Sequence, residues 1–194
     1  VVTNGSGDIV YEQDVTDEVA DGVANVTWNA TTDAGNVLPS GTYQLEISSA
    51  DSAGNENVTT QSVRVDTDAP AVETLGVSDG TEMTSVTVNS TDSVTISGTF
   101  NDTDSGVSSV DAIVSADSTS FEHAIDATLY DDETWTATLD VSSLPDDGTY
   151  TVGARAVDGA NNEQRSENDS LSIVVDRQAP SIGAAIQKVD GTTG

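Results

Sequence analysis

Short runs of alternating apolar and polar residues follow one another along most of the chain. Tyr43, Leu45 and Ile47 alternate with polar residues, which places the three apolar side chains on one face of a strand. Similar runs lie at 22–29, 63–65, 86–88, 94–100, 110–114, 134–139, 150–156 and 171–175. Gly, Asn and Asp, which are typical turn residues, separate these runs. The pattern predicts many short antiparallel strands and no regular helix.

One group of motifs occurs twice and indicates a duplicated module. Trp28 lies fifteen residues before Tyr43, and Trp135 lies fifteen residues before Tyr150. These four aromatic residues are predicted to lie in the cores of the two copies. Each tyrosine follows a Leu-Pro and a Gly-Thr pair at the start of a strand, which resembles a tyrosine corner. We therefore expect each tyrosine hydroxyl to bond to the backbone a few residues upstream.

The duplication predicts two modules and the start of a third. Module one covers 1–68 and is expected to lack its first strand; an Asn-Gly-Ser-Gly hairpin turn lies at 4–7. Module two covers 69–178, and a third module begins within 179–194. The spacing of strands and turns predicts an all-β chain of two tandem Ig-like, fibronectin III-like antiparallel β-sandwiches. Pro70 and Pro180 end the two joints and favour extended, semi-rigid connections.

The charge balance limits the partners of the chain. There are 34 acidic and five basic residues, and the formal net charge is −29. Nucleic acids and anionic membranes require basic contacts, so cations are the favoured partners. Asp outnumbers Glu 24 to 10, which indicates a halophilic protein whose self-repulsion is screened by salt; an acidic secreted protein is the alternative. The chain has no cysteine and no apolar run long enough for a direct membrane span.

Asparagine sequons point to N-linked glycans. The Asn-x-Ser/Thr pattern begins at seven positions, which are Asn4, Asn25, Asn29, Asn57, Asn89, Asn101 and Asn168. This number exceeds the chance expectation of about three for this composition. Asn25 and Asn29 are predicted on the polar face of a strand, opposite Trp28. The alternative is that Asn, Ser and Thr are simply common in turns and exposed strands.

Carboxylates gather where the modules are expected to meet. Asp66 and Asp68 lie in the first joint, and Asp102 and Asp104 lie in a predicted loop of module two. Further acidic loops follow the repeated tyrosines, at Asp51 and Asp158. Calcium, which takes six to eight oxygen ligands, is the one cofactor that this arrangement suggests. The alternative is that Asp forms turns and an acidic surface, and the second joint has Gln178 in place of Asp68.

No arrangement of residues predicts catalysis. His123 is the only histidine, it falls on the apolar face of a predicted hairpin, and no nucleophile motif accompanies it. We therefore expect no catalytic residues and no enzyme activity.

Two stretches resemble known families of surface proteins. Residues 26–43 resemble the Ig-like domain of the flagellar hook-capping family. Residues 96–100, 104–107 and 158–162 resemble bacterial and archaeal Ig-like repeats. Together with the acidity and the sequons, the chain is similar to haloarchaeal cell-wall or S-layer glycoproteins.

The resemblance implies a structural function outside the cell. The chain would be a spacer and lattice element at the cell surface, and its partners would be further copies of itself or neighbouring surface proteins. An adhesin or extracellular filament component is one alternative. An accessory region of a secreted hydrolase is another.

Overall fold

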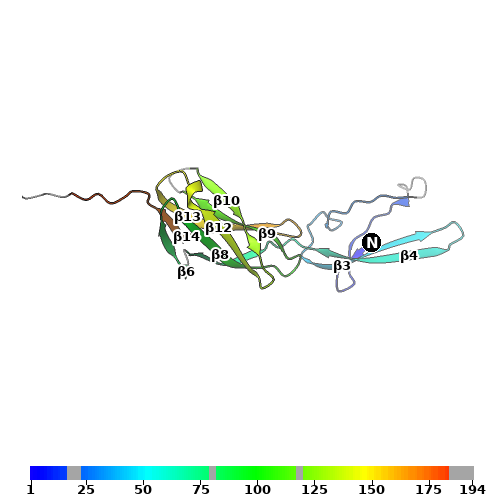
Figure 1. Ribbon diagram of the computed structural model, residues 1–194. Coiled ribbons are helices and arrows are strands. Elements are labelled where there is room, and N and C mark those ends of the chain that lie inside the picture. Colours follow the sequence, from blue (N-terminus) through cyan, green and yellow to red (C-terminus); the bar gives the residue numbers. More distant parts are fainter. Residues whose placement is uncertain (17–22, 79–81, 117–119, 184–194) are drawn as a thin grey trace, which may run out of the picture.

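Two β-rich bodies lie end to end in this computed structural model, which describes residues 1–16, 23–78, 82–116 and 120–183 (Figure 1). We call the first body, up to residue 65, module one and the second body, from residue 71, module two; the joint between them is residues 66–70. Almost every regular element is a strand, and the only helix bounded within the described residues is the short 3-10 helix η2 at Val141–Ser143. The predicted all-β Ig-like fold class is confirmed.

Module one contains a single four-stranded sheet in its described part. Its strands are β1 (Val2–Thr3), β2 (Ile9–Tyr11), β3 (Gly41–Ala50) and β4 (Glu56–Val65). They are antiparallel, in the order β2-β1-β3-β4. The predicted hairpin at 4–7 is confirmed, because Asn4 closes the turn by accepting the amides of Ser6 and Asp8 on its Oδ1. The long β3-β4 hairpin projects from the end of the module (Figure 1).

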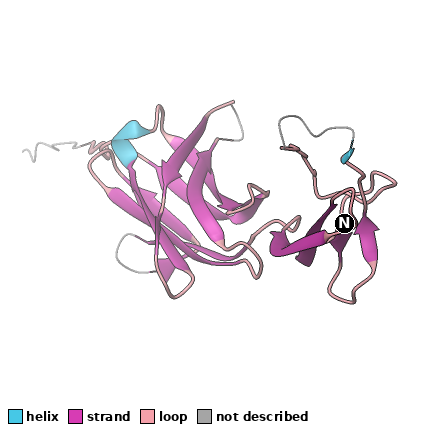
Figure 2. Ribbon diagram, turned by 90° about the vertical axis from the view of Figure 1, so that its right-hand side faces the viewer, coloured by secondary structure: helices cyan, strands magenta, loops and turns pink. Residues whose placement is uncertain are grey.

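Module two is a complete sandwich of two five-stranded sheets (Figure 2). One sheet has the order β10-β9-β13-β14-β7, and the other has the order β11-β12-β8-β5-β6. The strands are β5 (Ala71–Ser78), β6 (Glu82–Met83), β7 (Ser85–Val88), β8 (Ser93–Asn101), β9 (Val107–Ser115), β10 (Glu122–Asp126), β11 (Thr128–Leu129), β12 (Thr134–Asp140), β13 (Gly148–Asp158) and β14 (Glu163–Val175). All pairs are antiparallel except β14 with β7, which is parallel.

The core of module two lies between its sheets. Trp135 is completely buried, and Val94, Ile96, Val152 and Leu171 are buried within the same cluster. The opposing apolar faces come from the alternating runs, because successive strand residues point to opposite sides. The chain has no cysteine, so no disulfide bond supplements this core.

The core of module one is much smaller. Its buried residues are Val2, Leu38, Tyr43 and Val65. Trp28 is only partly buried; its ring packs edge-on against Tyr43 with centroids 6.4 Å apart. Its indole N–H donates to the Thr31 carbonyl at 2.8 Å, whereas the buried indole N–H of Trp135 has no hydrogen-bond partner.

The strand predicted at 22–29 is wrong over residues 24–29, and Gly22 lies outside the described residues. Residues 24–29 form no regular element, although Trp135, the counterpart of Trp28, lies in β12. β12 is held as a strand by its ladder to β8, in which Trp135 is paired with Gly98. No described strand pairs with residues 24–29, so their amides and carbonyls are in no described ladder. The prediction that Asn25 and Asn29 lie on a strand face is therefore also wrong.

Candidate functional site

The first joint, residues 66–70, is fixed to module one by hydrogen bonds. The Ser40 hydroxyl accepts the Thr67 amide at 2.9 Å and contacts Asp66 Oδ1 at 3.4 Å. The same carboxylate oxygen accepts the Asp68 amide at 3.1 Å. Ser40 directly precedes β3, and Asp66 directly follows β4. These bonds therefore fasten the start of the joint to the end of the hairpin where β3 begins and β4 ends.

Two loops of module two face the joint, and each is built around one aspartate. Asp102 Oδ1 accepts the amides of Asp104, Ser105 and Gly106 at 2.8–3.0 Å in the β8-β9 loop. In the β13-β14 loop, the side chain of Asp158, which is only 1% exposed, accepts bonds from Ala160 and Asn162. Each carboxylate therefore holds its own loop in shape by hydrogen bonds to that loop.

The loops and the joint are connected directly. Asp66 Oδ2 accepts the Ser105 amide at 3.0 Å, and the Asp66 carbonyl accepts the Asn162 side-chain amide at 3.2 Å. Arg64, at the end of β4, forms an ion pair with Asp104 at 2.7 Å and donates to the Thr103 carbonyl. The two modules thus share a polar network that constrains their relative orientation.

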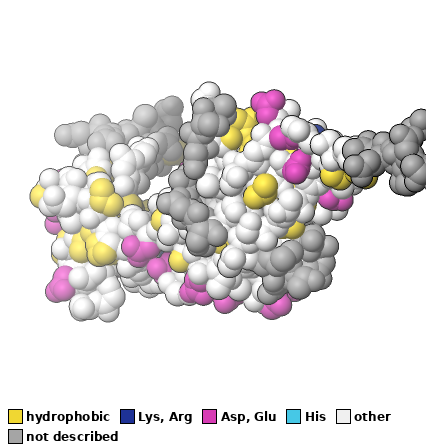
Figure 3. All heavy atoms as spheres, turned by 90° about the vertical axis from the view of Figure 1, so that its left-hand side faces the viewer, with side chains coloured by type: hydrophobic (Ala, Val, Ile, Leu, Met, Phe, Trp, Pro, Cys, Tyr) yellow, Lys and Arg dark blue, Asp and Glu magenta, His cyan; other side chains and the backbone are white. Residues whose placement is uncertain are grey.

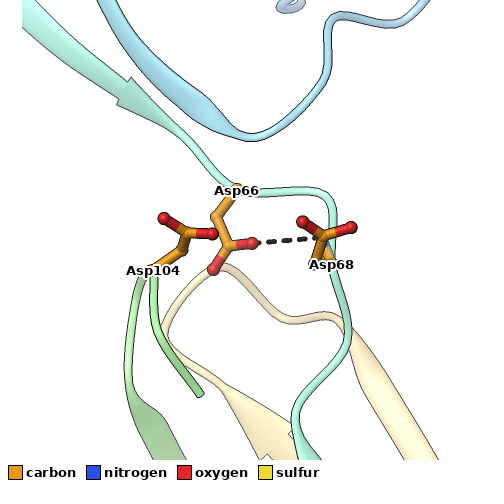
Figure 4. Close-up of side chains that lie close together, drawn as sticks. All are labelled: Asp66, Asp68 and Asp104. Carbon is orange, nitrogen blue, oxygen red and sulfur yellow. Dashed lines mark hydrogen bonds between the residues drawn. The ribbon is translucent and has the colours of Figure 1, made fainter.

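This network brings five carboxylates together. Asp66, Asp68 and Asp104 form one group in which oxygen atoms lie within 4.8 Å of one another (Figure 4). Asp66, Asp102 and Asp158 form a second group by the same measure. All four predicted metal-site residues therefore lie at the joint. Asp158, with Asp51 as the alternative, was predicted among the carboxylates where the modules meet but not as a metal ligand, because its approach to Asp66 depends on the packing of β13 and β14.

The local environment favours the ionised form of Asp66. Its pKa is below the usual value of 3.8 mainly because of hydrogen bonding with Ser105, with smaller contributions from Asp68 and Ser40. Partial desolvation acts in the opposite direction but does not outweigh these bonds. The site therefore holds an acceptor-only carboxylate at neutral pH, and hard cations such as Ca²⁺ and Mg²⁺ prefer such oxygen donors.

The second joint has a different chemistry. Asp176 Oδ1 accepts the Gln178 amide, as Asp66 accepts that of Asp68. Arg177 forms an ion pair with Asp147 at 3.1 Å and donates to the carbonyls of Val141 and Leu144. The guanidinium of Arg177 therefore lies at the position of this joint that Thr67 holds in the first joint. The start of a third module within 179–194 stays a prediction, and residues 184–194 lie outside the described part of the chain.

Both repeated tyrosines form tyrosine corners. The Tyr43 hydroxyl donates to the Pro39 carbonyl at 2.9 Å, and the Tyr150 hydroxyl donates to the Asp146 carbonyl at 2.8 Å. Each bond spans four residues and closes the turn that leads into β3 or β13. These residues, like the buried Trp135, serve the fold and lie apart from the carboxylates.

The sequons differ in exposure. Asn25, Asn29, Asn57 and Asn89 are exposed. Asn4 and Asn101 are half-buried, and Asn168 lies in β14 with its side chain outside the described part. Asn4 and Asn89 already accept backbone amides in their own turns.

His123, the only histidine, is half-buried on β10 and stacks on Phe121, with ring centroids 6.4 Å apart. The described residues contain no helix with the length and apolar character needed to cross a bilayer. Acidic side chains are spread over the visible surface of both modules (Figure 3).

Three solved structures align with the chain at low similarity. A tetra-tandem repeat in the extending region of a large adhesion protein has 24% identity and a TM-score of 0.42, covering 90% of this chain and 40% of that one. A Ca²⁺-stabilised adhesin that helps an Antarctic bacterium bind ice has 23% identity and a TM-score of 0.34, covering 72% and 33%. A 1.5-MDa bacterial ice-binding adhesin has 20% identity and a TM-score of 0.34, covering 71% and 42%. The chain thus spans less than half of each.

Family models account for both modules. Residues 1–54 match the FlgD Ig-like domain, in agreement with the resemblance of module one to the hook-capping family. Residues 69–177 match a bacterial Ig-like domain and make up more than half of the chain. No curated protein matches. The chain is therefore a tandem array of Ig-like modules and belongs to the bacterial Ig-like domain family.

Proposed function

We propose that the chain is a non-catalytic spacer in an extracellular array of Ig-like modules, and that calcium fixes the angle at its first joint. The proposal rests on one observation: the β8-β9 loop and the β13-β14 loop of module two, which are built around Asp102 and Asp158, both contact Asp66. A joint without such contacts would let the modules swing, since linkers are mobile by default. Bonds from Ser105 and Asn162 to Asp66 oppose that motion.

The group Asp66, Asp102 and Asp158 is the better candidate for the ion. Asp104 is already neutralised by Arg64 at 2.7 Å, and this guanidinium would repel a cation bound beside it. Asp102 binds its loop amides through Oδ1, so its Oδ2 is the oxygen available to a ligand. Asp158 contributes a carboxylate from a buried position. Backbone carbonyls and water would complete the six to eight oxygens that calcium takes.

The charge and the exposed sequons of the chain indicate the environment in which the array would work. A net charge of −29 favours a salty environment, in which the array would be an S-layer or cell-wall glycoprotein. The exposed sequons at Asn25, Asn29, Asn57 and Asn89 would carry N-linked glycans. Its partners would be further copies of itself or neighbouring surface proteins.

Calcium titration tests the proposal directly. Calorimetry on the whole chain in molar NaCl should detect one site, and Asp102→Asn should weaken it by about tenfold or more, since affinity depends on the number of charged ligands. Small-angle scattering should show a narrower distribution of end-to-end distances with calcium than with chelator.

Asp51 offers a matched control for Asp158. It accepts the amides of Ala53 and Asn55 in module one as Asp158 does those of Ala160 and Asn162, but it lies away from the first joint. Asp158→Asn should weaken calcium binding, whereas Asp51→Asn should leave it unchanged. Equal effects of both substitutions, or no saturable heat in the unmodified chain, would refute calcium binding at the joint.

A further inference from the structure

The outer face of one sheet in module two carries hydroxyl groups in place of charges. Val94, Ile96 and Leu139 are buried in the core, so the residues that alternate with them on β8 and β12 point outward. The strand register joins these outward residues and those of β5 into three rows across the sheet. The rows are Thr74-Thr99-Thr134, Gly76-Ser97-Thr136 and Ser78-Thr95-Thr138. None of these residues is charged, although the chain has a net charge of −29.

The two rows nearer the first joint line a hollow of about 530 Å³. The hydroxyl oxygens of Thr74 and Thr99 lie 2.8 Å apart on its wall, and the hydroxyl of Thr136 lies 3.2 Å from that of Tyr130. Gly76 leaves space between them, since a Cβ added there would meet only the Ser97 hydroxyl, at 4.0 Å. The wall therefore offers several groups that both donate and accept hydrogen bonds.

A buried donor without a partner lies at the floor of the hollow. Trp135 lines the hollow although it is completely buried. Its indole N–H has no hydrogen-bond partner among the described residues, whereas the indole N–H of Trp28 donates to the Thr31 carbonyl. An unpaired buried donor destabilises a fold, so an oxygen acceptor from a ligand would be favourable here. Hydroxyl walls above such a donor suit a neutral ligand rich in hydroxyl groups.

A sequon lies at the end of the hollow. Asn101 is the next outward residue of β8 after Thr99, and it is paired with Ala71 of β5. Two residues of a strand span about 6.7 Å, so Asn101 lies one row from the wall residue Thr99. The side chain of Asn101 is half-buried. A sugar attached to Asn101 would therefore begin close to the sheet, beside the hollow.

We propose that Asn101 carries an N-linked glycan of neutral sugars, and that its first sugars lie in this hollow against Thr99 and Thr136. The covalent link gives these sugars a high effective concentration at the hollow, so contacts too weak to hold a free sugar are sufficient. The glycan would then lie along module two instead of projecting from it. The inference rests on the N-glycosylation of the proposed function, and it requires no calcium.

NMR of native glycoprotein labelled with ¹³C and ¹⁵N tests the inference. Nuclear Overhauser contacts are expected between sugar protons and the methyl groups of Thr99 and Thr136. Asn101→Gln and Thr103→Ala each remove the sequon, so both should abolish these contacts and shift the Trp135 indole N–H signal. Thr103→Ser keeps the sequon and should retain the contacts. Thr103 is exposed, and its carbonyl, which accepts from Arg64, is unchanged by either substitution.

A second pair of variants separates docking of the glycan from its attachment. Thr136→Val removes one hydroxyl from the wall and keeps the sequon, so the glycan mass should stay while the contacts at Thr99 weaken. Thr138→Val is the matched control, because Thr138 lies one row further along β12 and is not part of the wall. This control should change neither the glycan mass nor the contacts.

Three outcomes would overturn the inference. One is native chain with glycans at Asn25 or Asn57 and none at Asn101, which would leave the glycosylation of the proposed function intact. Another is a glycan at Asn101 that makes no contact with Thr99 or Thr136. The third is contacts that survive Asn101→Gln, which would mean that a sugar from another source fills the hollow. Bare asparagine at every sequon would refute both the inference and the proposed glycosylation.

Discussion

Removing the hydroxyl of Tyr150 isolates the contribution of the tyrosine corner. The ring is only 3% exposed, and the hydroxyl both donates to the Asp146 carbonyl at 2.8 Å and accepts the Asp146 amide at 3.3 Å. One net hydrogen bond contributes about 1 kcal/mol, and an unpaired partly buried carbonyl adds to the loss. Tyr150→Phe should therefore destabilise module two by about 1–2 kcal/mol. For a domain of this size that lowers its melting temperature by roughly 4–10 °C.

Native-state amide exchange by NMR resolves the two modules in one experiment. Slow amides of β13 should lose protection by about 5- to 30-fold, while those of β3 should be unchanged. Tyr130→Phe is the matched control, because the Tyr130 ring is 48% exposed and its hydroxyl contacts only the exposed side of β12, at Thr136. Equal losses from Tyr150→Phe and Tyr130→Phe, or equal losses in both modules, would refute the reasoning.

Four further expectations concern packing, pH, salt and glycans. Gly98→Ala places a methyl carbon 2.1 Å from the Thr74 carbonyl oxygen and should lower the unfolding free energy by about 3 kcal/mol, measured by urea denaturation, whereas Gly76→Ala should be nearly neutral. The pKa of Asp66 is lowered in the folded chain, so the stability that ionised Asp66 gives the joint is complete well above pH 3.8 and is lost as the pH falls through the lower folded-state pKa. Exchange of the Ser105 amide should become faster over that pH range. Asp66→Asn should remove this pH dependence of exchange. Reducing NaCl from about 1 M to about 0.01 M lengthens the Debye length from about 3 to about 30 Å and should lower the melting temperature; an unchanged melting curve would contradict the halophilic interpretation. In native material, Asn25→Gln should remove one glycan mass, and an unaltered intact mass would exclude that site.

The repeated motifs predicted much of module two because local and tertiary preferences agree there. The alternating run at 150–156 forms part of β13, and its apolar residues meet the second sheet. The same pattern failed at 22–29, where no described strand provides backbone partners. Alternation specifies which side of a strand would be buried, but a strand also needs a neighbour for its amides and carbonyls.

The candidate site also combines residues that a local pattern predicted with contacts that depend on tertiary packing. Asp66, Asp68, Asp102 and Asp104 were predicted from their positions in a joint and a nearby loop, because carboxylates at turns are visible in a sequence. Asp51 or Asp158 was predicted near the meeting point of the modules, but neither was predicted as a metal ligand. The place of Asp158 beside Asp66 requires β13 and β14 to carry its loop back to the joint, and the pairing of Arg64 with Asp104 depends on the same docking.

The sequence by itself determined the all-β class, the duplication, the tyrosine corners and the acidity, because strand periodicity, repeated spacing and charge are properties of neighbouring residues. Only the tertiary structure decided which carboxylates converge at the joint, that β14 gains a parallel partner in β7, and that β4 has an open edge in the described part of module one. These features join residues far apart in the chain, and strand pairing and loop packing bring them together.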